Sequence, residues 1–153
     1  MCFKLGNECL YSEQMLVEFN EDPAFYICKS QTGKYYVVLC LDVEEGNYTI
    51  INSDVHDILL MLYGKITMRN LYERVDCFWK VCVGKKIEED VVSKYNIEDI
   101  DTSILPYEGA YFVIYNQEIE DYALELKSLF NVVYKKQIND LIDRINDIIN
   151  FNN

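Results

Sequence analysis

The sequence predicts an α+β fold, in which an antiparallel β-meander of about five strands packs with short helices and precedes a long C-terminal helix. Runs rich in β-branched and aromatic residues fill the first half, whereas apolar residues recur at helical spacing towards the end. The 153 residues fit a single hydrophobic core. We expect an α+β domain over residues 1–115 and a helical extension over residues 116–153.

Four strands are expected in the first half, separated by turn residues, at residues 14–19, 24–30, 34–43 and 47–53. In the third of these, Val37 and Leu39 share one face, while Tyr36 and Val38 share the other. Both faces are apolar. We therefore expect this strand to lie in the middle of the sheet, with other elements covering each side.

A helix is expected over residues 52–65, because Asn52 or Ser53 can cap its start and Gly64 can end it in the left-handed conformation. Its expected core face includes Ile58 and Leu62.

Residues 66–74 predict a second short helix with Thr67 as its cap, and residues 76–84 predict the fifth strand. The run AYFVIY at 110–115 predicts either a late strand or a buried approach to the last helix.

The final helix is expected from Asn116 to about Asn150, because apolar residues recur at steps of three and four. The step from Val133 to Ile138 is five residues long, which shifts the phase and predicts a kink, a break or a second helix near 134–137. Such an apolar face packs either on the sheet or on a second copy of the chain, forming a homodimer. Both alternatives stay open from the sequence.

The formal net charge is −12, from 26 acidic and 14 basic residues. This field opposes binding to nucleic acids and to anionic lipids, and it favours a basic protein as partner. Residues 86–121 hold ten acidic residues against Lys86 and Lys94. The candidate partner-binding residues in this stretch are Glu88, Glu89, Asp90, Glu98, Asp99, Asp101, Tyr107 and Glu108.

The stretch LDVEEGNYTI at 41–50 places Asp42 and Glu44 ahead of Gly46. A calcium loop of the EF-hand type needs glycine as its sixth residue and glutamate as its twelfth, whereas counting from Asp42 makes Gly46 the fifth and Ser53 the twelfth. The pattern therefore fails, and we expect a solvated hairpin turn. The Gly-Lys pairs at 64–65 and 84–85 lack the other residues of a phosphate-binding loop.

Six cysteines without a C-x-x-C spacing, and a single histidine, argue against a zinc site within the chain. His56 is a candidate base for Cys28 or Cys40, but its place on the first turn of a helix, off the apolar face, favours a structural role. We expect no catalytic residue, no metal and no cofactor.

The N-terminal segment has no apolar core typical of a secretory signal, and no stretch approaches the roughly 20 apolar residues of a membrane span. A cytoplasmic location with reduced thiols is expected.

Residues 20–75 follow a recognisable pattern: a strand after a proline, a strand ending in aspartate, an acidic turn, another strand, and a helix closed by G-x-I-x-x-R. The matching positions are Pro23, Gly33, Tyr35, Asp42, Gly64, Ile66 and Arg69. This half of the chain resembles a family of small uncharacterised bacterial and phage-associated α+β domains, for which the resemblance implies no particular activity. Within the fold, Arg69 and Asp42 are expected to form a structural salt bridge.

Small size, absent catalytic motifs and localised negative charge favour a non-enzymatic acidic protein-binding module. The expected function is inhibition of a partner by covering its basic, nucleic-acid-binding surface, as phage anti-defence proteins such as anti-CRISPR proteins, or immunity proteins, do. Two alternatives are a scaffolding or oligomerisation module that assembles through the C-terminal helix, and an enzyme of unrecognised type that uses carboxylates or a cysteine.

Overall fold

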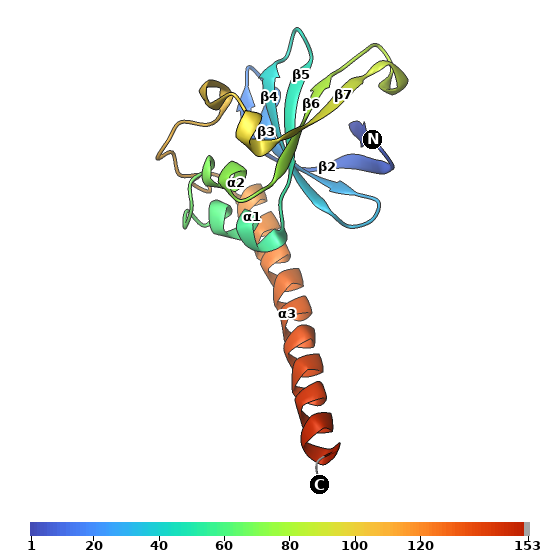
Figure 1. Cartoon of the computed structure of the whole chain (residues 1–153). Coiled ribbons are helices and arrows are strands. Elements are labelled where there is room, and N and C mark those ends of the chain that lie inside the picture. Colours follow the sequence, from blue (N-terminus) through green and yellow to red (C-terminus); the bar gives the residue numbers. More distant parts are fainter. Residues whose placement is uncertain (152–153) are drawn as a thin grey trace.

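The computed structural model describes residues 1–151, which form a strongly curved antiparallel sheet from which one long helix projects (Figure 1). Within those residues the sheet has seven strands in chain order, each antiparallel to the next. Asn152 and Asn153, the last residues of the expected 116–153 extension, lie outside the described residues. The predicted α+β class, antiparallel sheet and long C-terminal helix are confirmed.

The strands are β1 (Phe3–Leu5), β2 (Glu8–Phe19), β3 (Asp22–Ser30), β4 (Tyr35–Asp42), β5 (Asn47–Asn52), β6 (Cys77–Cys82) and β7 (Val91–Asn96). The helices are α1 (Val55–Leu62), α2 (Asn70–Glu73) and α3 (Gln117–Phe151), with short 3₁₀ turns η1 (Ile87–Glu89), η2 (Ile97–Asp99) and η3 (Thr102–Ile104).

The expected number of about five strands was too low, because β1 and β7 lack a clear sequence signal. β1 has three residues, and five of the six residues of β7 are exposed. A strand that buries neither face has no alternation of apolar and polar residues to reveal it. β2 also begins at Glu8, six residues before the predicted start at 14.

Both faces of the sheet are covered, as the alternation in β4 predicts. Val37 and Leu39 belong to the core beneath α1 and α3, whereas Tyr36 and Val38 belong to a second core on the other face. The first core also contains Leu16, Phe25, Ile27, Ile51, Ile58, Leu62 and Phe78. The second contains Phe3, Leu5, Leu10, Tyr26, Cys28, Ile50 and Val81.

The cap of α1 is Asp54, whose Oδ1 accepts a hydrogen bond from the Asp57 N–H at 2.8 Å. The predicted caps Asn52 and Ser53 are wrong because both are bound to the neighbouring strand: the Asn52 side-chain amide and the Ser53 N–H donate to the Tyr35 carbonyl, at 3.0 and 3.1 Å.

The end of α1 follows the sequence prediction. Gly64 has φ +69°, and the Lys65 N–H donates to the Leu60 carbonyl at 2.8 Å, a bond that commonly closes a helix at a left-handed glycine.

The residue that caps α2 is Arg69, so the predicted cap Thr67 lies two residues too early. Thr67 instead closes the turn before the helix: its Oγ1 accepts from the Asn70 N–H at 3.1 Å, while the Asn70 Oδ1 accepts from the Thr67 N–H at 2.8 Å. The helix covers only Asn70–Glu73, so the predicted span of 66–74 was too long. Residues 110–115 form no strand, and of the alternative, a buried approach to α3, only Phe112 is buried, at 5% exposure.

α3 runs without interruption from Gln117 to Phe151, so the break considered at 134–137 is wrong. The sequence there, Tyr-Lys-Lys-Gln, contains neither glycine nor proline, and the backbone stays helical although the apolar face changes direction. Ile119, Ala123 and Leu126 are buried against the body of the protein. The described residues from 131 onward are all exposed.

Replacing Leu126 by alanine is expected to destabilise the protein by about 2–5 kcal/mol, because this side chain is 2% exposed in the core beneath α3. The control Leu124→Ala lies on the same helix at 51% exposure and should change stability by less than about 0.5 kcal/mol. Urea unfolding measures both. Equal losses in the two variants would show that Leu126 does not hold α3 on the body.

Candidate functional site

The eight predicted partner-binding residues fall into two groups separated by β7. Glu88, Glu89 and Asp90 lie in the β6–β7 hairpin, in and just after η1, whereas Glu98, Asp99, Asp101, Tyr107 and Glu108 follow β7. The six residues of β7 span about 20 Å. Figure 1 shows the hairpin and the segment after β7 at opposite edges of the view. The structure therefore does not bring the eight residues together on one surface.

The predicted acidic residues remain without basic partners. In the described part of the chain, the ion pairs join Lys34 to Glu8 (3.7 Å) and Arg74 to Asp57 (2.9 Å), and the His56 Nδ1 lies 3.4 Å from the Asp57 carboxylate. None of them includes a predicted partner-binding carboxylate. The surplus negative charge of the chain is therefore presented to solvent and to any partner.

Two of these carboxylates bind backbone groups. Asp90 accepts a hydrogen bond from the Gly84 N–H at 2.9 Å. Asp101 accepts from the Ser103 hydroxyl at 2.7 Å and from the Ser103 N–H at 3.0 Å, and these bonds lower the pKa of its carboxyl. Both groups organise the local chain while remaining at the surface.

Residues 97–116, called here the acidic loop, are held in place by Arg69. Its Nε donates to the Pro106 carbonyl at 2.8 Å, and its Nη2 donates to the Thr102 carbonyl at 2.7 Å. The expected Arg69–Asp42 salt bridge is wrong. The Asp42 Oδ1 instead accepts from the Glu45 N–H at 3.1 Å and closes the β4–β5 turn.

Further contacts fix the second half of the acidic loop. The Ala110 carbonyl accepts from the Met68 N–H at 3.1 Å, and Phe112 fills the core beneath α3. The Tyr115 hydroxyl donates to the Leu16 carbonyl at 2.9 Å. Asn116 then caps α3, since its Oδ1 accepts from the Ile119 N–H at 2.9 Å. The loop is thus anchored along its length despite having little regular structure.

The acidic loop presents large side chains to solvent. Tyr107 is 88% exposed, Tyr111 56%, Val113 72% and Tyr115 56%. Sequence reasoning selected Tyr107 but missed the other three. The signal was present in AYFVIY, where the inward Phe112 and Ile114 alternate with outward Tyr111, Val113 and Tyr115.

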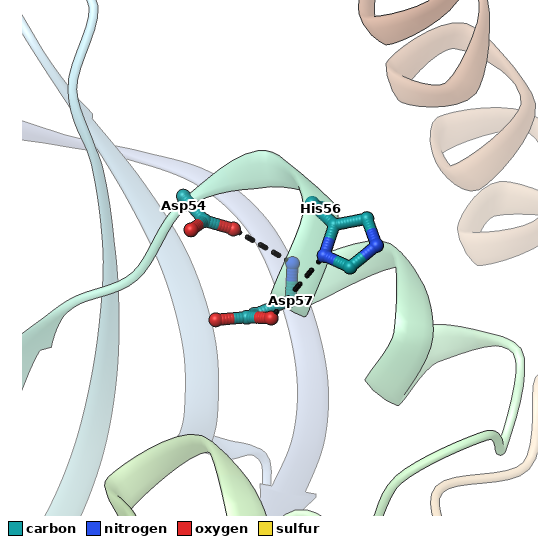
Figure 2. Close-up of side chains that lie close together, drawn as sticks. All are labelled: Asp54, His56 and Asp57. Atoms are coloured by element: carbon teal, nitrogen blue, oxygen red, sulfur yellow. Dashed lines mark hydrogen bonds and ion pairs between the residues drawn. The ribbon is translucent and has the colours of Figure 1, made fainter. Parts of the chain in front are cut away.

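Among residues 1–151, Asp54, His56 and Asp57 form a cluster of potential metal ligands, with one ligand atom from each within 4.8 Å of the others (Figure 2). Both carboxylates already have partners, because Asp54 caps α1 and Asp57 binds the Arg74 guanidinium. The Arg74 guanidinium thus neutralises the negative charge of Asp57, which would otherwise attract a metal cation. The cluster therefore stabilises the start of α1.

His56 packs beside the Phe130 ring, 5.9 Å between centroids, on the helix-covered face of the sheet. Cys28 belongs to the core on the opposite face, and Cys40 points the same way as Tyr36 and Val38 along β4. The sheet therefore separates the histidine from both candidate nucleophiles.

A polar hollow of about 450 Å³ lies near the start of α1 and is lined in part by Glu8, Asp57 and Trp79. Its charges nearly cancel, with four carboxylates against three cations: Glu8 pairs with Lys34 and Asp57 pairs with Arg74, while Lys94 lies over the Trp79 ring at 5.2 Å. The hollow presents little unbalanced charge to a substrate.

The Cys2 thiol has an altered acidity. A hydrogen bond from the Cys28 thiol lowers the pKa of Cys2 to about 6, whereas the same contact and burial raise the pKa of Cys28. Cys2 is exposed and Cys28 is fully buried.

Comparison with protein-family models, with curated proteins and with solved structures finds no match for this chain. The resemblance of residues 20–75 to bacterial and phage-associated domains stays a prediction. Among residues 1–151, no helix has an apolar stretch long enough to cross a membrane.

Arg69→Leu is expected to loosen the acidic loop, because two carbonyl groups lose a charged donor worth roughly 1.5–3 kcal/mol each. Amide hydrogen exchange across residues 97–116 should accelerate. The control Arg74→Leu removes a partly buried ion pair with Asp57, away from this loop, and should leave exchange in the loop unchanged. Equal loop exchange in the two variants would refute the anchoring role of Arg69.

Alkylation of Cys2 by iodoacetamide should reach half of its maximal rate near pH 6, because the thiolate is the reactive form and the pKa of this thiol is about 6. Peptide mass mapping follows Cys2 separately from the other thiols. Cys28→Ala removes the donor and should move the midpoint upward. A midpoint near the ordinary thiol value of about 8.5 in the unmodified chain would contradict this arrangement.

Proposed function

We propose that the protein is a non-enzymatic binding module whose acidic loop docks on a basic surface of another protein. The observation that supports this most directly is the combination, within one anchored loop, of carboxylates without ion-pair partners and highly exposed tyrosines. Connections of this length without regular structure are uncommon in compact domains unless they serve binding or catalysis.

Anchoring favours affinity because the loop is already ordered in the free protein, so binding does not cost the entropy of ordering it. Arg69, Phe112 and Tyr115 hold the backbone in the free protein. The side chains of Tyr107 and Tyr111 then offer large contact areas with few rotatable bonds.

The charge of the loop defines the kind of partner. Glu98, Asp99 and Glu108 are exposed carboxylates, and together with the net charge of −12 they favour approach to a cationic surface. A nucleic-acid-binding surface is the proposed target, since carboxylates can occupy positions where phosphates would lie. Inhibition would then be steric and electrostatic, as expected of a phage anti-defence or immunity-type protein acting in the cytoplasm.

The hairpin residues Glu88, Glu89 and Asp90 have a different role in this proposal. They lie beyond β7 from the loop and contribute to the long-range field that steers association, while the loop forms the direct contact.

The test is affinity capture with the immobilised full chain, comparing Glu98→Gln/Asp99→Asn/Glu108→Gln with Glu18→Gln/Glu44→Gln/Glu45→Gln. Both triple variants remove three exposed negative charges, but the second set lies in β2 and in the β4–β5 turn. The proposal expects a basic, nucleic-acid-binding protein to be retained by the unmodified chain and by the control, with affinity for the loop variant reduced on the order of tenfold or more.

Bound partner should also lose affinity for its nucleic acid, and capture should weaken as salt concentration rises. Equal capture by the two variants, or a captured partner that still binds nucleic acid normally, would contradict the proposed role of the loop.

A further inference from the structure

The last part of α3 is amphipathic and uncovered. Its apolar residues, called here the C-terminal stripe, are 39–64% exposed and are Tyr134, Ile138, Leu141, Ile142, Ile145, Ile148 and Ile149. The opposite face of the helix carries Asn139, Asp140, Asp143, Asp147 and Asn150. Figure 1 shows this part of α3 projecting away from the sheet. No other described part of the chain covers the stripe.

The middle of the stripe is rotated around the helix from the residues that dock α3 on the body. Counting back from Ile138 in steps of four and three leads to Tyr134, Asn131 and Lys127, which therefore share its side of the helix. Ile119 and Leu126 lie about a quarter of a turn from this line, buried against the body, whereas Leu141 follows Ala123 by five full turns and lies on the same side as that residue. The five-residue step noted in the sequence is the point at which the apolar face changes direction.

The stripe leads into a groove between α1 and α3. This α1–α3 groove has a volume of about 460 Å³ and is lined by Leu60, Tyr63 and Phe130, together with Lys65 and Lys127. The other residues that line it are His56, Leu59 and Asn131, so none of its lining side chains is acidic. Phe130 stacks on Tyr134 at 6.1 Å between centroids, which joins the groove to the start of the stripe.

The charges of the chain indicate what fits these surfaces. Residues 134–151 contain three basic residues, Lys135, Lys136 and Arg144, and three aspartates, so this segment is neutral in a chain of net charge −12. Two such segments can approach without net repulsion. A helix also carries partial negative charge at its C-terminal end, which suits a groove containing Lys65 and Lys127.

We infer that a second copy of this chain covers the stripe, with the two α3 helices packed antiparallel and the C-terminal turns of each helix reaching the near end of the α1–α3 groove of the other, beside Tyr134. In this register Leu141 and Ile142 form the central layer. Ile138 faces the partner's Ile145, and Tyr134 faces the partner's Ile149. The apolar spacing of three and four residues is the spacing that packs one helix against another.

The antiparallel direction follows from the charges and the groove. The net charge of −12 lies entirely in the body and the first half of α3, so a parallel pair would place two strongly acidic bodies side by side. Antiparallel helices place them at opposite ends of a shared segment about 27 Å long. This direction alone brings the C-terminal turns of one copy to the groove of the other.

The first test is the solution mass of the full chain, measured by light scattering. The unmodified protein should have twice the mass of the 18.1 kDa chain. Ile142→Glu/Ile145→Glu should be monomeric and still folded, because both side chains are exposed in the single chain. The control Asn139→Glu/Asn150→Glu adds the same charge to the polar face and should stay dimeric.

The second test addresses the groove. Lys65→Glu/Lys127→Glu should weaken the dimer, whereas the control Lys85→Glu/Lys86→Glu makes the same charge change in the β6–β7 hairpin and should leave the dimer unchanged. Equal dimer affinity of the two variants would overturn the seating of the helix end at the groove.

The third test addresses direction by oxidative cross-linking in a Cys2→Ser/Cys82→Ser background, which removes the exposed native thiols. Mixed Tyr134→Cys and Ile149→Cys chains should form a disulfide with each other and not with themselves. Self-linked products would overturn the antiparallel arrangement.

A monomeric mass for the unmodified chain at tens of micromolar would overturn the inference. So would a monomer that co-sediments with phosphatidylcholine–phosphatidylglycerol vesicles, because a lipid surface would then be the occupant of the stripe. None of these outcomes depends on the acidic loop, so they are separate from the test of the proposed function.

Discussion

The packing of the first turns of α3 against the sheet is the contact on which the rest of the arrangement depends. Ile119, Ala123 and Leu126 insert into the core that also contains Val37 and Phe78. This contact covers one face of the sheet and fixes the point where the acidic loop must end. It also sets the direction in which the remainder of α3 leaves the body.

The backbone of the acidic loop is fixed at its C-terminal end and in its middle. Its C-terminal end is tied to α3 through Asn116 and to β2 through the Tyr115 hydroxyl, and its middle is tied to Arg69 beside α2. A guanidinium that donates to two backbone carbonyls can order a segment that has no strand-to-strand hydrogen bonds of its own. The charges on the loop therefore stay at the surface, while its backbone is satisfied internally.

The sequence was informative wherever one residue pattern met one structural requirement. Alternation in β4 predicted two covered faces, and Gly64 predicted the end of α1. It was uninformative where the same residues could meet two structural requirements, such as capping a helix and bonding to a neighbouring strand. Asn52 and Ser53 are good helix caps, but both donate hydrogen bonds to the carbonyl of Tyr35 in the neighbouring strand. Asp54 therefore caps α1 instead.

The candidate site was predictable only in part, for related reasons. Glu88 and Asp99 are close in sequence, but β7 separates them, and that strand buries too little surface to be recognised beforehand. The partners of Arg69 are backbone carbonyls, which carry no residue signature. The shift of apolar phase after Val133 was visible, but it marks a change of exposed face within a continuous helix.

The central claim is that α3 has two halves, one docked on its own body and one completed by a second copy. Hydrogen exchange of the full chain at increasing dilution tests this claim most directly. Amides of residues 117–130 should stay protected at every concentration, whereas amides of residues 134–151 should lose protection as the protein is diluted. Protection of residues 134–151 that does not depend on concentration, or rapid exchange of residues 117–130 throughout, would contradict it.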